Sequence, residues 1–175
     1  MTTLKDRLPA TLATERLVLA APTMAHAPAI ARLCNNKNVH KWMSRLPFPY
    51  TAEDARFFVE EIVPSAEELC YGMLLDDELI GVIGLTFAQG EDPVLGYWLG
   101  EPYWGHGYAT EAGKAVIAAA RAAGIQSLNS RALSDNARSL HVLGKLGFVQ
   151  THVGAEPIGP NAGVEATFLR LDLSR

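Results

Sequence analysis

The chain has 175 residues, 49% of them apolar, which is enough for one domain with its own core. Fifteen basic and nineteen acidic side chains give a net charge of −4, so no overall positive field draws it to nucleic acid or an anionic membrane. It has neither a signal-peptide run nor the roughly 18 uninterrupted apolar residues of a membrane span, and we expect a cytoplasmic protein. Cys34 and Cys70 lack metal-site spacing and histidine partners, so we expect no metal, no disulfide and two buried thiols.

Periodicity and capping signals predict the elements in the first half of the chain. Alternating polar and apolar residues indicate a strand at 14–20. A capped helix is predicted at 24–35, and Thr51 opens a capping box for a second helix at 52–63. Between them, the prolines of 39–50 prevent regular structure, so the many aromatic side chains of this segment must pack elsewhere.

Strands and helices alternate in the second half. The acidic run 76–78 predicts a tight hairpin between two antiparallel strands. The alanine-rich stretch Ala109 to Ala123 is the strongest helix signal, and Gly124 suits a left-handed cap after it. The predicted elements are strands at 71–75, 79–87, 94–99, 127–133, 148–153 and 165–173, and helices at 109–123 and 136–146.

A glycine turn joins the predicted strand at 94–99 to the alanine-rich helix. Gly105 and Gly107 let consecutive backbone N–H groups point inward at the positive end of that helix, which makes a site for a diphosphate. A strand-to-helix turn of this kind also occurs without a ligand. The dinucleotide-binding fingerprint fails, because Thr110 stands where its third glycine belongs. The phosphate loop of NTPases fails as well, since five residues rather than four separate Gly107 from Gly113.

Two segments resemble the GNAT superfamily of N-acetyltransferases. The turn W-G-H-G-Y-A at 104–109 is similar to the family's pyrophosphate-binding pattern Q/R-x-x-G-x-G/A, although Trp104 stands at its first position. The G-Y-W-L run at 96–99, followed by Tyr103 to Ala112, is typical of the branch that includes ribosomal-protein N-terminal acetyltransferases. Residues 136–148 are similar to that branch's N-x-x-S-x-x-V-L-x-K-L-G-F.

The resemblance implies a fold and a cofactor. The fold is the α/β GNAT fold in one domain, 1–175, with a mixed, mostly antiparallel sheet of about seven strands, a central splay and about four flanking helices. In that family the pantetheine of acetyl-CoA lies against a strand, often bulged, beside the splay, and this strand corresponds to 94–99 here. The residues assigned to acetyl-CoA are Trp98, Leu99, Gly100, Trp104, Gly105, His106, Gly107, Tyr108, Ala109, Thr110, Asn136 and Ser139.

The catalytic assignments follow the same resemblance. Related enzymes often use a tyrosine seven residues after the motif asparagine as general acid, but Leu143 occupies that position. Ser139 is the substitute, either as a proton donor to the sulfur or as a positioning group. Glu101, just past the strand at 94–99, is the candidate general base, and its alternative is an exposed loop carboxylate. His106 either touches phosphate or is a solvated loop residue.

The expected reaction is direct acetyl transfer to a primary amine, either a protein N-terminus or a small amine. Both monomer and homodimer stay open. The alternative function is a catalytically silent acyl-CoA-binding sensor or scaffold, which the missing tyrosine at Leu143 favours. Trp42 and Phe48 have an equally good interpretation as packing residues. The residues assigned to the acceptor are His40, Trp42, Met43, Phe48, Tyr50 and Tyr97.

Overall fold

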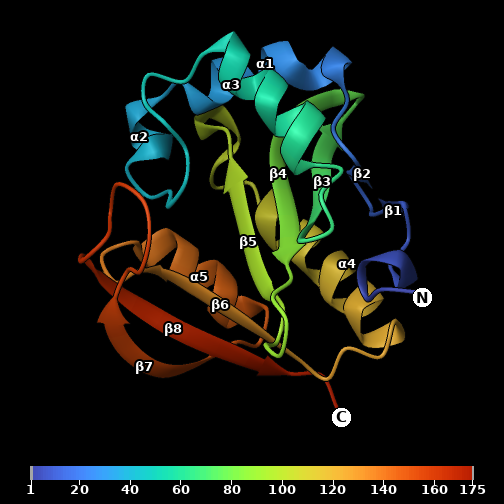
Figure 1. Ribbon diagram of the computed structural model, residues 1–175, viewed down its shortest axis with the longest axis vertical. Helices are drawn as coiled ribbons and strands as arrows, with labels where there is room; N and C mark the ends of the chain where they lie inside the picture. Colours follow the sequence, from blue (N-terminus) through green and yellow to red (C-terminus); the bar gives the residue numbers. More distant parts are fainter. Residues whose placement is uncertain (1, 175) are drawn as a thin grey trace.

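Eight strands form one mixed sheet, in the order β1-β2-β3-β4-β5-β6-β8-β7, in the computed structural model, which describes residues 2–174 (Figure 1). The strands are β1 (Thr11–Ala13), β2 (Val18–Ala20), β3 (Glu68–Leu75), β4 (Glu78–Thr86), β5 (Val94–Leu99), β6 (Ser127–Leu133), β7 (Val149–Ala155) and β8 (Glu165–Asp172). The α-helices are α1 (Ala27–Cys34), α2 (Lys37–His40), α3 (Ala52–Phe57), α4 (Tyr108–Ala122) and α5 (Ala137–Lys145). The α/β fold class is confirmed, with one strand and one helix more than expected, namely β1 and α2.

Several boundaries in the first half differ from the prediction. The helix predicted at 24–35 is α-helical over Ala27–Cys34, and the one predicted at 52–63 is α-helical to Phe57 and continues as a π-helix to Ile62. Only the second part of 14–20 is a strand, because Thr14 turns the chain by donating its N–H to the carbonyl of Leu17 at 2.8 Å. The asparagine-rich run after α1 begins a new helix, since Asn36 caps α2 by accepting from the N–H of Asn38. The capping box at Thr51 is confirmed.

The predicted hairpin joins β3 to β4. Asp76 and Asp77 both have positive φ, at 48° and 68°, which suits a two-residue turn between antiparallel strands. β3 starts at Glu68, three residues before the predicted start, and this extension pairs Glu68 with Thr86 of β4.

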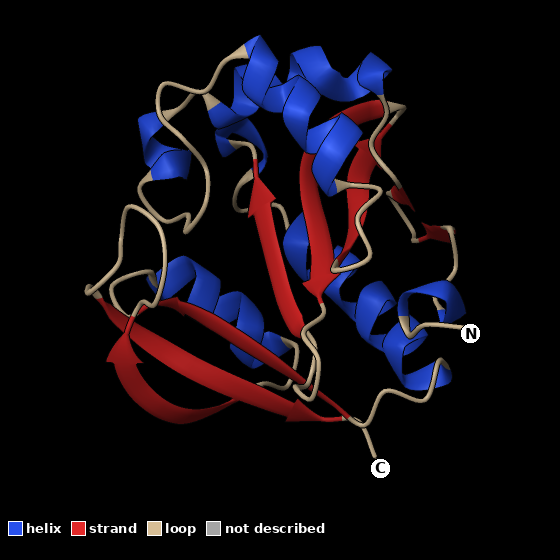
Figure 2. Ribbon diagram, viewed as in Figure 1, coloured by secondary structure: helices blue, strands red, loops and turns tan. Residues whose placement is uncertain are grey.

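The sheet opens between β5 and β6, the only neighbouring strands that run parallel within residues 2–174 (Figure 2). They share a single pair, Val94 with Asn129, and β6 pairs along its whole length with β8 instead. β4 and β5 pair without a register shift, so the bulge expected in β5 is wrong. The splay therefore comes from the divergence of β6.

The two faces of the sheet are covered by different helices (Figure 2). On one face, Ala112 and Val116 of α4 pack against the buried Leu95 of β5. On the other face, Ile30 of α1 lies in one cluster with Trp98. Alternation along β5 therefore sends Leu95, Tyr97 and Leu99 toward α4, and Val94, Gly96 and Trp98 toward α1 and α3. None of the helices within residues 2–174 is long and apolar enough to cross a membrane.

Candidate functional site

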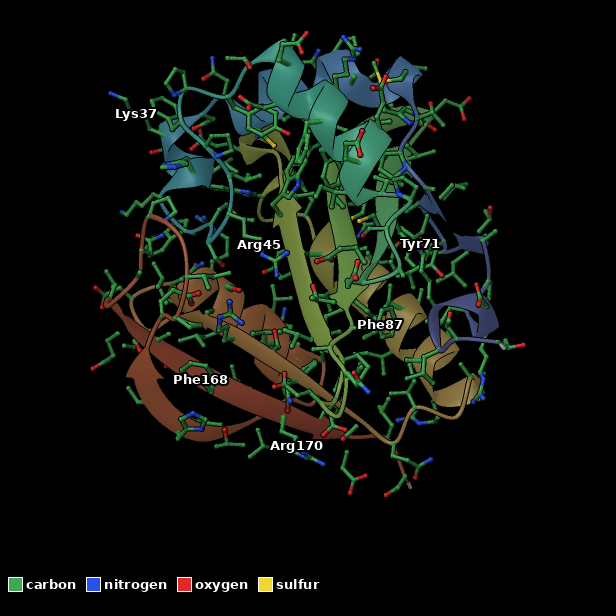
Figure 3. The ribbon with its side chains drawn as sticks, in the orientation of Figure 1. Lys37, Arg45, Tyr71, Phe87, Phe168 and Arg170 are labelled. Carbon is green, nitrogen blue, oxygen red and sulfur yellow. The ribbon has the colours of Figure 1, made fainter. Side chains whose placement is uncertain are left out.

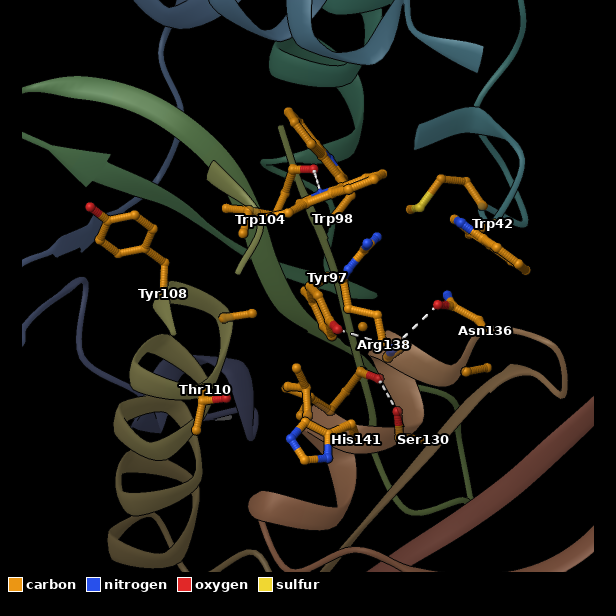
Figure 4. Close-up of a pocket in the computed structure, with 18 of the residues that line it drawn as sticks. Trp42, Tyr97, Trp98, Trp104, Tyr108, Thr110, Ser130, Asn136, Arg138 and His141 are labelled. Carbon is orange, nitrogen blue, oxygen red and sulfur yellow. Dashed lines mark hydrogen bonds between the residues drawn. The ribbon is translucent and has the colours of Figure 1, made fainter. Parts of the chain in front are cut away.

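A cavity of about 440 Å³, which we call the splay cavity, lies where β5 and β6 diverge (Figure 4). Its walls come from β5, the glycine turn and first residues of α4, β6, the exposed face of α5 and the loop after α2. Segments far apart in sequence therefore meet in one site. The predicted residues that line it are Trp42, Met43, Tyr97, Trp98, Leu99, Trp104, Gly105, Gly107, Tyr108, Ala109, Thr110, Asn136 and Ser139.

The glycine turn has the conformation that its sequence predicts. Gly105 and Gly107 have φ of +79° and +81°, and Gly107 is the N-cap of α4. A Cβ at Gly105 would meet nothing within 4 Å, and one at Gly107 would meet only Arg16 Nη2, at 3.4 Å. The glycines are thus required by backbone conformation rather than by crowding, and the N-cap of α4 provides no side-chain hydrogen bond to its first-turn N–H groups.

Cations surround this helix end. Arg16 stacks its guanidinium 4.3 Å from the ring centroid of Tyr108, and Arg138 lies 4.2 Å from that of Trp104. Arg138, Lys145 and Arg131 line the cavity, and Arg131 is paired with Glu156, whereas no acidic residue lines it among the described residues. Electrostatic attraction thus adds to the backbone amides in favouring an anion.

These cations were absent from the sequence-based assignment, which relied on backbone amides alone. A signal existed in the spacing of α5, because 138, 141, 142 and 145 all line the cavity and follow helical periodicity.

Two hydroxyl groups meet at the inner part of the splay cavity. The phenol of Tyr97 donates to Ser139 Oγ at 3.3 Å, and Asn136 Oδ1 accepts from the Ser139 N–H at 3.2 Å (Figure 4). Burial raises the pKa of Tyr97, and the Ser139 hydrogen bond and Arg138 offset only part of this rise. The phenol therefore keeps its proton at neutral pH. Leu143 has an alkyl side chain, which carries no proton donor, and it is buried in the core.

A larger cavity of about 890 Å³, which we call the sheet-face cavity, lies on the side of β5 that faces α3. The two cavities meet at β5, because they share the lining residues Met43, Ser44, Leu95, Gly96, Tyr97, Trp98 and Arg131. Its lining includes three of the predicted acceptor residues, Met43, Tyr50 and Tyr97.

The charged residues of the sheet-face cavity were not predicted from the sequence. The Glu68 carboxylate accepts from the Thr86 hydroxyl at 3.0 Å and from Arg45 Nη1 at 2.8 Å. Figure 3 shows Arg45 in the loop beside β5. Arg131 is held by Glu156, whose two carboxylate oxygens accept from its Nε at 3.1 and 3.0 Å. No local pattern marks these residues, because strand register and loop packing bring them together.

Five predicted site residues line neither cavity. Glu101 accepts from the side chains of Asn36 and Asn38 at 3.3 and 2.6 Å, so both of its oxygens are engaged by the loop at α2. The rings of His40 and Phe48 contact each other, with centroids 5.3 Å apart. The remaining two residues are Gly100, which is buried beside Leu33, and His106, which is exposed beside Tyr108.

Comparison with known proteins agrees with this geometry. The acetyltransferase (GNAT) domain model matches residues 16–149. The chain is 28% identical over 149 residues to the uncharacterized N-acetyltransferase p20 of Bacillus licheniformis, covering 79% of this chain and 82% of that protein. Among solved structures, Mycobacterium smegmatis RimJ in complex with CoA-disulfide is 17% identical, with a TM-score of 0.83 over 95% of this chain and 88% of that one. The ribosomal L7/L12 acetyltransferase RimL in complex with coenzyme A is 19% identical, with a TM-score of 0.79 over 95% and 98%.

Proposed function

Since the chain belongs to the GNAT acetyltransferase family, we propose that it transfers an acetyl group from acetyl-CoA to a primary amine. The observation that carries this proposal is the splay cavity, which has an anion-binding helix end at one side and the Tyr97–Ser139 pair inside. The RimJ and RimL structures contain CoA-disulfide and coenzyme A, which supports the choice of cofactor.

The cofactor diphosphate would bind at the glycine turn. The N-cap of α4, Gly107, provides no side-chain cap, so the first-turn N–H groups would bind the diphosphate, and Arg16, Arg138 and Lys145 would neutralise its charge. Two cofactor residues assigned from sequence, Gly100 and His106, do not line this cavity, so we assign them no contact with the cofactor.

The pantetheine would continue along the free edge of β5. Leu95 O accepts from the Ser130 hydroxyl and Leu99 O from Trp104 Nε1, so both carbonyls face the splay. Because backbone groups alternate along a strand, the N–H and C=O of Tyr97 face the splay too, where β6 has moved away. Tyr97 thus offers one donor and one acceptor to the pantetheine amides.

The chemistry is direct transfer. The amine nitrogen attacks the thioester carbon, the new N–C bond replaces the C–S bond, and the departing thiolate needs a proton. Ser139 supplies it, because its oxygen accepts from Tyr97 and its own hydrogen is free to point at sulfur. Tyr97 then reprotonates Ser139 and takes a proton back from solvent, because burial disfavours its ionised form. The attacking nitrogen loses one proton to water in the sheet-face cavity, so the protons balance.

An acyl-enzyme on cysteine is disfavoured. Cys70 lines the sheet-face cavity, but burial raises the pKa of its thiol to about 12, and burial raises that of Cys34 to about 12 as well. Neither thiol forms a thiolate nucleophile at neutral pH.

The second candidate is a silent acyl-CoA-binding module, which the buried Leu143 favours because the tyrosine of related enzymes is missing there. A screen of amines and N-terminal peptides with acetyl-CoA, read as free thiol, separates the two functions. Calorimetry should show that acetyl-CoA binds much more tightly than 3′,5′-ADP, which lacks pantetheine. Equal affinity of the two would indicate a nucleotide site instead.

A further inference from the structure

The floor of the sheet-face cavity has an open position at Gly96. Three rows of residues cross β3, β4 and β5 in register, namely Glu68–Thr86–Val94, Cys70–Gly84–Gly96 and Gly72–Val82–Trp98. A Cβ at Gly84 would clash with the carbonyl oxygen of Leu69, so packing requires that glycine. A Cβ at Gly96 would meet nothing within 4 Å, and its φ is not positive. Neither packing nor backbone conformation requires a glycine at position 96. The missing side chain leaves space for a ligand beside the splay.

The charged lining of the same cavity is acidic. Its described lining residues include four carboxylates, Asp54, Glu68, Glu91 and Asp92, against Arg45 and Arg131. Arg170 pairs with Asp92 at 2.7 Å, which leaves three carboxylates without that partner. Glu156, which is only 4% exposed, already neutralises Arg131. Arg45 is 58% exposed and meets only Oε1 of Glu68, and the Thr86 hydroxyl lies 3.2 and 3.0 Å from the two carboxylate oxygens. Each carboxylate oxygen has two lone pairs, so Oε2 can accept a further donor. The cavity therefore favours a cation.

Glu68 is too far from the splay to act on the reacting nitrogen. It lies two strands and two residues from Gly96, which places their Cα atoms about 12 Å apart at ordinary sheet spacings. Its carboxylate accepts from the Thr86 hydroxyl of the intervening strand and so lies nearer to β5 than its own Cα does. The distance from the carboxylate to the space above Gly96 is therefore on the order of 10 Å. Apolar side chains such as Leu46, Phe58 and Ile62 line the space.

Resting on the proposed function, we propose that the acceptor is a primary amine on an apolar chain whose far end carries a second positive charge. The reacting nitrogen lies above Gly96 at the splay, and the far cation binds Glu68. A free amino acid fits less well, because its carboxylate would enter an acidic cavity beside the reacting nitrogen.

Three probes of similar length test this class of acceptor: 1,6-diaminohexane, hexylamine and 6-aminohexanoate, whose far ends are cationic, apolar and anionic. We expect kcat/KM to be about tenfold higher for the diamine than for hexylamine and lowest for 6-aminohexanoate, as a hydrogen-bonded charge pair implies. Glu68→Gln keeps the size of the side chain but removes its charge, so the ratio between diamine and hexylamine should fall toward one. Glu67→Gln is the matched control, because Glu67 is exposed, adjacent and outside the cavity, and it should preserve the ratio.

Calorimetry on the CoA-saturated protein gives a readout that needs no turnover. The diamine should bind more tightly than 6-aminohexanoate, and Glu68→Gln should remove the difference while the affinity for acetyl-CoA is retained. A preference for 6-aminohexanoate, or the same ratio in Glu68→Gln as in the parent, would overturn the inference. If none of the three amines releases thiol while a peptide of the wider panel does, the inference fails and the proposed function stands. If nothing in the wider panel releases thiol, the proposed function fails, and the calorimetric preference still decides whether the cavity selects cations.

Discussion

At the scale of single residues, Gly107 carries the assignment of the diphosphate site. Its φ of +81° lies in the left-handed region, where a β-branched side chain is strongly disfavoured. We predict that Gly107→Val raises the Kd of acetyl-CoA at least tenfold while the protein stays folded. Gly124→Val is the matched control, because Gly124 has φ of +87° after the other end of α4, away from the cavity. Calorimetry that finds parental affinity in a folded Gly107→Val protein would show that the turn does not bind the cofactor.

Ser139 and Tyr97 carry the proposed proton transfer. A hydroxyl that protonates the thiolate acts mainly in the transition state, so Ser139→Ala should lower kcat and kcat/KM together, by roughly tenfold or more, with KM little changed. Tyr97→Phe should act in the same direction with a smaller loss, because Ser139 keeps its own proton. Steady-state kinetics with any accepted amine provides the measurement. Unaltered turnover in Ser139→Ala would exclude Ser139 as the acid.

At the scale of elements, hydrogen bonds among Thr14, Arg16 and Glu111, which we call the clamp, fix the turn before β2 against the start of α4. Glu111, in the first turn of α4, accepts from the Thr14 hydroxyl at 2.6 Å and from the backbone N–H and Nε of Arg16 at 2.9 and 2.7 Å. This arrangement holds Arg16 beside Gly107 and over the ring of Tyr108. The clamp therefore positions a cation at the proposed diphosphate site without lining the cavity itself.

The clamp predicts a pH-dependent contribution to stability. Burial alone would raise the pKa of Glu111, but the hydrogen bonds from Thr14 and Arg16 outweigh it and lower the pKa. A carboxyl with a lowered native pKa stabilises the fold above its unfolded pKa, and this stability is lost as the pH falls through the native pKa. Glu111→Gln should therefore lower the free energy of unfolding by about 1 kcal/mol at pH 7, and the deficit should shrink below about pH 4.

Denaturant titrations at pH 7 and at acidic pH check this prediction. Glu15→Gln removes a neighbouring exposed carboxylate and should have little effect at either pH. A deficit in Glu111→Gln that is equally large at both pH values would contradict an ionic clamp.

At the scale of the whole molecule, local patterns predicted the glycine turn and the cap of α5 better than the sheet-face cavity. The glycine turn and the cap at Asn136 are each contained in a few consecutive residues, so their geometry follows from sequence. The sheet-face cavity depends on the register of three strands, which no short segment encodes. Glu101 illustrates the limit, because it is close to the splay in sequence and yet is turned toward Asn36 and Asn38.

Catalysis in the splay cavity is the central claim, and one measurement tests it most directly. The protein is incubated with acetyl-CoA and a panel of amines and N-terminal peptides, and free thiol and acetylated amine are quantified together. We predict equal amounts of thiol and acetylated amine for at least one acceptor, with Gly107→Val and Ser139→Ala both reducing that yield. Tight binding of acetyl-CoA with no thiol release across the panel would contradict the account and identify a silent acyl-CoA-binding module.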